Sequence, residues 1–191
     1  MEIRSFLAFE LPGEMMAAID AVAADLRKTP LEARWVRPGN IHLTMVFLGN
    51  IPVGDVDPIK EKLRVVCEGY GPFRLSLNGI GCFPNSRRPR VLWIGLRGEG
   101  ERLSAFRDSL REALEDFGVE REDRPFRPHL TLGRFRRPPG PGSPLEEIFS
   151  KYRDLEGPEC RLDRLTFFKS TLKPTGAIYS RLAEWPLVGK K

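Results

Sequence analysis

The apolar and polar positions of the chain follow two patterns, which predict strands and helices in a mixed order. Apolar runs or strict alternation indicate strands at residues 3–9, 41–48, 73–77, 90–96, 129–135, 160–168 and 177–183. Apolar residues recur at helical spacing in the four segments 15–26, 59–66, 103–114 and 145–152. This order of strands and helices predicts the α+β class.

Turn and capping residues bound these elements. Asp57 followed by Pro58 predicts the N-cap and first position of the second helix, and Ser143, followed by Pro-Leu-Glu, predicts a capping box for the fourth. Gly118 is expected to end the third helix. The Pro- and Gly-rich stretch at 138–143 is expected to be a loop within a domain rather than a linker.

The pattern occurs twice in the chain, at a single offset of 129 − 42 = 87 residues. Without a gap, the tetrad His-Leu-Thr-Met at 42–45 falls on His-Leu-Thr-Leu at 129–132, and the apolar run at 6–9 falls on the run at 93–96. Each copy is expected to contain a strand, a helix, a strand, a helix and a strand. We infer that one unit has been used twice.

The chain, residues 1–191, is therefore expected to form a single bilobal domain. Its pseudo-repeats extend over about 3–81 and 90–168, and a closing strand at about 177–183 follows them. Two related lobes that face each other across a pseudo-twofold axis would enclose one central cleft.

The repeated tetrads hold the only two histidines of the chain. Residues two apart on a strand point to the same face, so His42 with Thr44, and His129 with Thr131, each present an imidazole beside a hydroxyl. The chain has six threonines, so chance would place one after both histidines about once in a thousand sequences. We expect both pairs to face the same cleft.

Two histidines suit an in-line displacement at phosphorus. A neutral imidazole takes a proton from the nucleophile and an imidazolium gives one to the leaving oxygen, so no metal is required and the pH profile is bell-shaped. The hydroxyls of Thr44 and Thr131 would donate to the non-bridging phosphoryl oxygens; ordinary strand propensity is the alternative explanation for these threonines.

Three other functions stay open at this point. A metal-dependent hydrolase would need further ligands, but neither tetrad contains Asp or Glu, and the three cysteines are isolated, so no metal or cofactor is expected. A non-catalytic RNA-binding module would need arginines and aromatic residues but no paired imidazoles. A phosphodiesterase for a small cyclic phosphodiester would keep the catalytic pair and change only the substrate.

Charge favours a polyanionic partner. The formal net charge is +5, with 31 Lys and Arg against 26 Asp and Glu, and arginines gather at 87–90 and 127–137. No segment approaches the roughly 18 uninterrupted apolar residues of a membrane helix, and the N-terminal MEIRSFLAFELPGE has no cleavage site. We therefore expect a cytoplasmic protein that does not enter membranes.

The duplicated H-x-T-x tetrads resemble those of the two-histidine (2H) phosphoesterase superfamily, and most closely the bacterial and archaeal RNA 2',3'-cyclic phosphodiesterases, also called 2'-5' RNA ligases. The likeness extends over nearly the whole chain. It is carried by RSFLAFELP from Arg4, WVRPGNIHLTMVFLG from Trp35, GCFP around Phe83, FRPHLTLGR from Phe126 and STLKPTGAIY from Ser170.

The resemblance implies a LigT-like α+β fold, in which duplicated β-α-β-α-β units place antiparallel sheets around a central basic cleft. It also implies hydrolysis of RNA 2',3'-cyclic phosphate ends to 2'-phosphate, with His42 as proton donor to the departing 3'-oxygen and His129 as proton acceptor from water. With a 5'-hydroxyl in place of water, the reverse reaction would give 2'-5' RNA ligase activity. The expected partner is RNA with a cyclic phosphate end, tRNA fragments included, and the protein is expected to be a monomer.

Two arginines beside the second tetrad are candidates for binding a substrate phosphate. Arg127 lies two residues before His129 and so shares its strand face, although a charge at the rim of the cleft is the alternative. Arg134 lies five residues after His129 and falls on the opposite face of a regular strand. A role for Arg134 would therefore require a β-bulge.

Four phenylalanines divide between the site and the core. Phe83 and Phe126 lie beside prolines and arginines and could stack on the terminal bases of RNA, although aromatic residues more often belong to a core. We assign Phe9 and Phe47 to the core.

Overall fold

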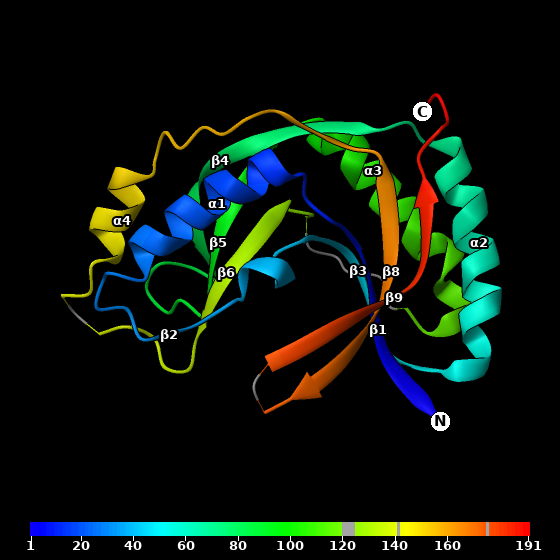
Figure 1. The fold of residues 1–191 in the computed structure, drawn as a ribbon, viewed down its shortest axis with the longest axis horizontal. Coiled ribbons are helices and arrows are strands. Elements are labelled where there is room, and N and C mark those ends of the chain that lie inside the picture. Colours follow the sequence, from blue (N-terminus) through cyan, green and yellow to red (C-terminus); the bar gives the residue numbers. More distant parts are fainter. Residues whose placement is uncertain (120–124, 141, 175) are drawn as a thin grey trace.

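The computed structural model describes residues 1–119, 125–140, 142–174 and 176–191. These residues form nine strands and four α-helices (Figure 1). The strands are β1 (Glu2–Phe9), β2 (Ala33–Trp35), β3 (Leu43–Pro52), β4 (Phe73–Phe83), β5 (Val91–Gly98), β6 (His129–Phe135), β7 (Cys160–Leu162), β8 (Arg164–Lys173) and β9 (Gly176–Pro186). The helices are α1 (Gly13–Leu26), α2 (Val56–Gly69), α3 (Gly100–Ala113) and α4 (Leu145–Lys151), with 3-10 turns at Pro38–Asn40, Val53–Asp55 and Glu115–Phe117.

The nine strands form one curled antiparallel sheet. Its order is β7-β4-β5-β6-β3-β1-β8-β9, and β2 pairs with β6. Only Asp163 separates β7 from β8, although β7 lies at one end of the order and β8 is next to the other end, so the single strand expected at 160–168 is wrong. Because neighbouring Cα atoms are about 3.8 Å apart, the two ends of the sheet must approach each other at this residue. The predicted antiparallel α+β fold is confirmed. The sheets expected on the two sides of the cleft are parts of one continuous sheet.

The strand order is symmetric about the contact between β6 and β3. A shift of 87 residues carries β4 onto β7 and β8, β1 onto β5 and β3 onto β6, so the inner order β4-β5-β6-β3-β1-β8 is the same from either end. At the centre Leu43 pairs with Leu130, and 130 − 43 = 87. The same shift carries α1, 13–26, onto α3, 100–113.

The helices and the main core cover one face of this sheet. Figure 1 shows α1 and α4 toward one end of the molecule and α2 and α3 toward the other. Phe9, Phe73 and Phe106 meet in the core with ring centroids 5.4 to 6.1 Å apart, so the core assignment of Phe9 is confirmed. A second, small cluster contains Phe6, Ala8 and Phe168 with Tyr179, since successive residues of β1 point to opposite faces.

The second helix begins earlier than predicted. Val56 is its first residue and Asp55 occupies the N-cap position without a side-chain hydrogen bond, so the capping role expected for Asp57 is wrong. The 3-10 turn at Val53–Asp55 runs directly into the helix and extends it toward its N-terminus. Pro58 still lies in the first turn, where a missing N–H costs no intrahelical bond.

The capping box expected at the fourth helix is also wrong. The helix begins at Leu145, and no side chain caps it. The backbone N–H of Ser143 donates to the Gly140 carbonyl at 3.2 Å as part of a preceding turn, and the Pro144 carbonyl accepts the first helical bond from Ile148 at 2.9 Å. The turn therefore leaves Ser143 one residue before the N-cap position.

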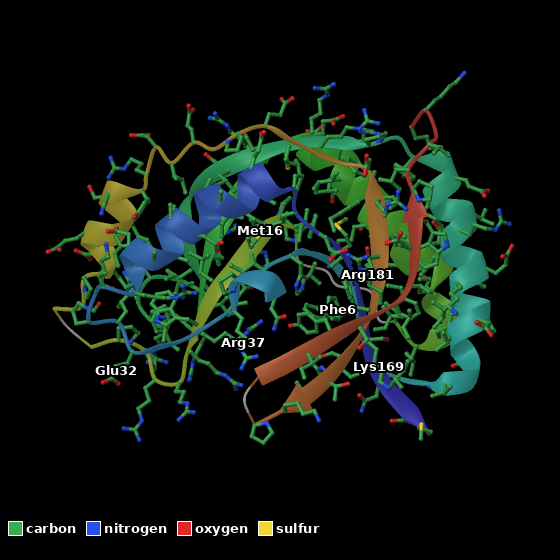
Figure 2. All side chains as sticks on the ribbon, in the orientation of Figure 1. Phe6, Met16, Glu32, Arg37, Lys169 and Arg181 are labelled. Atoms are coloured by element: carbon green, nitrogen blue, oxygen red, sulfur yellow. The ribbon has the colours of Figure 1, made fainter. Side chains whose placement is uncertain are left out.

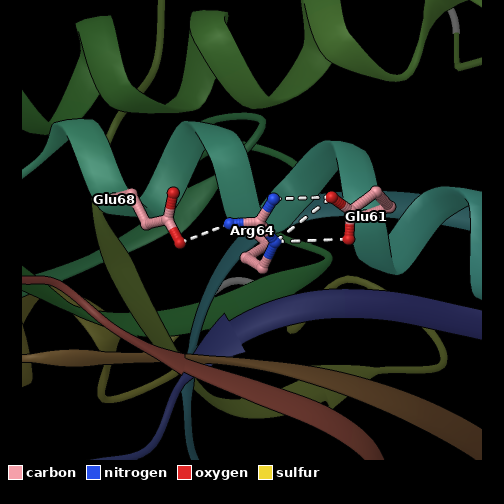
Figure 3. A network of polar contacts seen from close by, with 3 residues as sticks. All are labelled: Glu61, Arg64 and Glu68. Atoms are coloured by element: carbon pink, nitrogen blue, oxygen red, sulfur yellow. Dashed lines mark hydrogen bonds and ion pairs between the residues drawn. The ribbon is translucent and has the colours of Figure 1, made fainter.

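Helix α2 carries a charge network on its exposed face. Arg64 contacts Glu61 at 2.6 Å and Glu68 at 2.5 Å, one helical turn away on either side (Figure 3). Such pairs contribute about 0.3–0.5 kcal/mol each, so their main effect here is to neutralise Arg64. None of the helices in the described residues is long and apolar enough to span a membrane.

Candidate active site

The two histidine tetrads meet in one cavity. His42 directly precedes β3, so the strand expected at 41–48 begins later, at Leu43; His129 is the first residue of β6. Both histidines, with Thr44 and Thr131, line a cavity of about 1130 Å³. Because the residues that follow each histidine pair with one another across the sheet, the two imidazoles enter the cavity from adjacent strands.

The two imidazoles are held by equivalent backbone contacts. Nδ1 of His42 lies 2.7 Å from the carbonyl oxygen of Asn40, and Nδ1 of His129 lies 2.8 Å from that of Arg127. A carbonyl can only accept, so Nδ1 carries the hydrogen in both rings. In the neutral form, Nε2 of each ring is then left as the proton acceptor.

Aromatic side chains fix the plane of each imidazole. Phe6 stacks on His42 with ring centroids 4.8 Å apart, and Tyr179 meets the same ring edge-on at 5.4 Å. His129 contacts Phe83 edge-on at 4.9 Å and Trp93 at 6.2 Å. Figure 2 shows Phe6 at the centre of the molecule beside the β8–β9 hairpin. Each histidine is therefore held by rings from strands on its own side of the sheet.

The surroundings favour neutral histidines in the free protein. Burial lowers the pKa of His42 to about 4, against the opposing effects of the Asn40 carbonyl and the charge of Glu10. Burial also lowers the pKa of His129, and the positive charge of Arg134 lowers it further. The two sites thus differ in the sign of the neighbouring charge, although their backbone contacts are the same.

A β-bulge lies at the last residue of each tetrad and changes which of the following residues face the cavity. In the β1–β3 pairing, Leu7 lies opposite Val46 and Ala8 opposite Thr44, so Met45 is an extra residue. In the β5–β6 pairing, the extra residue is Leu132, which lies 87 residues further along the chain. After each bulge, the residues that point to the cavity are at odd rather than even distances from the histidine.

The bulges bring Phe47 and Arg134 to the cavity at matching positions, each five residues after a histidine. The core assignment of Phe47 is therefore wrong, because its side chain is 62% exposed. A role for Arg134 was expected to require a β-bulge, and the bulge at Leu132 meets this requirement. Burial raises the pKa of Tyr179 and the charge of Arg134 opposes this, so Arg134 lies near both Tyr179 and His129.

The other predicted substrate residues, Arg127, Phe83 and Phe126, line the same cavity. Arg127 precedes β6 rather than lying in it, and its side chain is exposed. Phe126 packs partly against the main core, and the guanidinium of Arg107 lies 4.8 Å from its ring centroid. Arg107 also donates to the Met45 carbonyl at 3.1 Å, which ties the segment before the second tetrad to the first.

Sequence reasoning missed several residues of the site. Asn40 could have been found from the repeat, because an offset of 87 carries it onto Arg127; Phe6 falls on Trp93, which the sequence did not mark as a site residue. Tyr179 comes from β9, which follows both pseudo-repeats in the sequence. Four further cavity arginines were not singled out as site residues: Arg4, Arg90, Arg107 and Arg111.

The polar groups of the cavity offer hydrogen bonds rather than a metal-ligand set. Within the described ranges, no three His, Cys, Asp or Glu side chains come together in a way that could hold a metal ion. In the same ranges, neither Thr44 nor Thr131 uses its hydroxyl in a hydrogen bond to the protein. Two imidazoles, two hydroxyls and several arginines therefore share one cavity, an arrangement able to bind and transfer protons to a phosphate ester.

Comparison with known proteins gives consistent matches over most of the chain. The family model described as the 2'-5' RNA ligase superfamily matches residues 13–173. An RNA 2',3'-cyclic phosphodiesterase of Methanothermobacter thermautotrophicus is 31% identical over 180 residues, which cover 94% of this chain and 96% of that protein.

Two solved structures share the fold. A protein of Thermus thermophilus superposes with a TM-score of 0.82 at 30% identity and covers 99% of this chain and 100% of its own. E. coli LigT in complex with 3'-AMP superposes with a TM-score of 0.73 at 25% identity and covers 98% of this chain and 99% of its own.

Proposed function

The chain belongs to the 2'-5' RNA ligase superfamily, and on this basis we propose that it hydrolyses the 2',3'-cyclic phosphate ends of RNA to 2'-phosphates by proton transfer between two histidines. The observation that carries the proposal is the matched presentation of His42 and His129. Each has Nδ1 held by the carbonyl two residues earlier and Nε2 left for chemistry, and both line one cavity.

In the proposed reaction, His129 acts as general base and His42 as general acid. Nε2 of His129 takes a proton from water while the water oxygen bonds to phosphorus. The bond between phosphorus and the 3'-oxygen breaks, and Nε2 of protonated His42 gives its proton to that oxygen. The product keeps the phosphate on the 2'-oxygen. Proton exchange with solvent then restores both rings, and a 5'-hydroxyl in place of water would run the reverse, ligating direction.

Hydroxyl and guanidinium donors would stabilise the charge on the phosphoryl group. Thr44 and Thr131 each stand beside a histidine with a hydroxyl that makes no hydrogen bond within the described part of the chain. Arg134 lies near both His129 and Tyr179, and Arg127 lines the same cavity. Such donors act where negative charge develops in the transition state.

The charges beside the two histidines differ. Burial lowers the pKa of both rings, that of His42 to about 4; Glu10 opposes this shift at His42, whereas Arg134 adds to it at His129. Burial alone would leave His42 neutral in the free protein, so its protonated form requires a further negative charge. The bound phosphodiester supplies that charge beside His42 and raises its pKa in the complex.

Two other functions make different predictions. An RNA-binding module would bind RNA ends with full affinity and leave the cyclic phosphate closed. A phosphodiesterase for small cyclic phosphodiesters would gain nothing from an RNA chain attached to the substrate. The arginines of the cavity, Arg4 and Arg90 among them, favour the longer polyanion.

The proposal is tested with an oligonucleotide that ends in a 2',3'-cyclic phosphate, incubated with the protein in EDTA. Separation of 2'- from 3'-phosphate products gives both the reaction and its regiochemistry. We expect the 2'-phosphate alone, at a rate unaffected by EDTA. Tight binding without opening of the ring would favour the binding module, and restoration of turnover only by added metal would contradict the two-histidine mechanism.

A further inference from the structure

Phe47 presents an aromatic ring at the cavity that the hydrolytic mechanism does not use. Its side chain is 62% exposed, the largest exposure of any aromatic residue among the described residues. The bulge at Met45 places Phe47 on the cavity face, and a regular strand would have turned it toward the core. An exposed Phe on a concave surface is a candidate contact for a ligand.

Phe47 lies beyond the rings that hold His42. The ring centroid of Phe6 is 4.8 Å from that of His42 and 6.1 Å from that of Phe47, so Phe6 contacts both rings. These two distances put the centroid of the Phe47 ring at most 10.9 Å from that of the His42 ring. The Phe47 ring therefore lies within about one nucleotide's length of His42, with Phe6 in contact with both.

Other aromatic side chains of the cavity are already engaged. Phe83 contacts Trp93 at 5.1 Å and His129 at 4.9 Å. Phe126 packs against the core and the guanidinium of Arg107. Phe47 contacts only Phe6 among the described rings, so one of its faces remains available for stacking.

A cation and a second apolar side chain accompany Phe47. Arg4 is exposed on β1, two residues before Phe6, and makes no ion pair within the described part of the chain. It differs in this from Arg64 on α2, which two carboxylates neutralise. Leu172 of β8 is 70% exposed and lines the same cavity. An aromatic ring beside an unpaired arginine is the arrangement by which proteins bind single-stranded nucleic acid.

We infer that Phe47 and Arg4 form a subsite for the nucleotide that precedes the cyclic phosphate nucleotide, with its base stacked on Phe47 and the connecting phosphodiester near Arg4. This inference rests on the proposed function. A 2',3'-cyclic phosphate occupies the 3' end, so the RNA chain continues in the 5' direction alone. The cavity of about 1130 Å³ exceeds the roughly 300–1,000 Å³ of ordinary small-ligand pockets and has room for more than one nucleotide.

The test measures binding and hydrolysis separately. The binding probes are adenosine 2'-phosphate and the dinucleotide ApA with a terminal 2'-phosphate, and the ratio of their dissociation constants gives the contribution of the upstream nucleotide. The same ratio for kcat/KM is measured with the corresponding cyclic phosphates. Stacking on one aromatic residue changes affinity about tenfold, so we expect Phe47→Ala to lower both ratios by about that factor.

Matched variants separate stacking from loss of apolar surface. Phe47→Tyr keeps the ring and should hold the ratios within about twofold of the wild type. Val65→Ala removes another exposed apolar side chain, 59% exposed on α2 and outside the cavity, and should leave the ratios unchanged. Arg4→Gln should lower the ratios for ApA but not for an analogue whose internal linkage is an uncharged methylphosphonate.

Two outcomes would overturn the inference. Equal losses for mononucleotide and dinucleotide in Phe47→Ala would place the ring against the terminal nucleotide, and unchanged dissociation constants for both probes would remove it from RNA binding. A protein that bound the dinucleotide through Phe47 but opened no cyclic phosphate would instead contradict the proposed function. The binding measurements thus test the Phe47 subsite independently of the proposed hydrolysis.

Discussion

At the scale of single residues, His42 and His129 share a backbone contact and differ in electrostatic surroundings. The common contact leaves Nε2 of both rings toward the cavity. Glu10 favours protonation of His42, and Arg134 opposes protonation of His129. Because burial lowers the pKa of His42 to about 4, the acid role of His42 requires the charge of a bound phosphodiester to raise that pKa.

The acid role of His42 predicts rescue by a better leaving group. A substrate with sulfur in place of the 3'-oxygen releases a thiolate, and thiols ionise near pH 8.5, far below alcohols, so no proton donor is needed. We expect this substrate to restore His42→Ala to within about tenfold of the wild type and to leave His129→Ala inactive. The test compares kcat/KM for the two variants on both substrates. Rescue of His129→Ala instead of His42→Ala would make His129 the acid and His42 the base.

Burial of His42 also predicts how stability depends on pH. Its pKa is about 4 in the folded protein and near 6.5 in the unfolded chain. The unfolded chain therefore binds more protons between these values, and stability falls as the pH drops from 6.5 to 4, by at most about 3 kcal/mol. Urea unfolding at pH 7 and pH 4.5 should show a smaller loss in His42→Phe than in the wild type. Equal losses in the two proteins would contradict the lowered pKa.

At the scale of elements, bulges and close packing between strands position the catalytic side chains. Gly81 of β4 pairs with Trp93 of β5, and a Cβ at this glycine would lie 2.3 Å from the indole ring. Trp93 in turn contacts His129 and Phe83. The absence of a side chain at Gly81 thus allows the indole to lie beside the second histidine.

This packing predicts a substitution that acts on catalysis from outside the cavity. Gly81→Ala must displace Trp93, so we expect a loss of about 1–3 kcal/mol in stability and a fall in kcat as His129 shifts. Gly13→Ala, where the added Cβ meets nothing within 4 Å, is the matched control. Unfolding free energies and kcat are compared; a Gly81→Ala protein as active and stable as the control would contradict the role of this contact.

The sequence predicted the elements and the paired tetrads well, because apolar periodicity and the repeat record them directly. It failed at Phe47 and left Arg134 uncertain, since strand alternation carries no sign of where a bulge inserts one residue. It joined β7 to β8 because one residue, Asp163, separates two strands of similar composition. Tyr179 could not be placed, because its contact with His42 depends on the curl of the sheet.

At the scale of the whole molecule, the symmetry of the sheet brings one tetrad from each half to the same cavity. We propose that the chain is a single bilobal domain formed from one unit used twice, with pseudo-repeats near 3–81 and 90–168. The pairing of Leu43 with Leu130, and the equivalence of α1 and α3, support this proposal. Neither half alone would then contain a complete acid and base pair.

The central claim is that the two histidines act as one catalytic unit. The most direct measurement is kcat/KM on RNA ending in a 2',3'-cyclic phosphate, in EDTA, for the wild type, His42→Ala, His129→Ala and the double variant, each shown to be folded by circular dichroism. We expect each single substitution to lower the rate by about 10²–10⁴-fold. The double variant should lose less than about tenfold more, since groups that act together are not additive. Turnover that survives either single substitution would show that these histidines are not the catalytic pair.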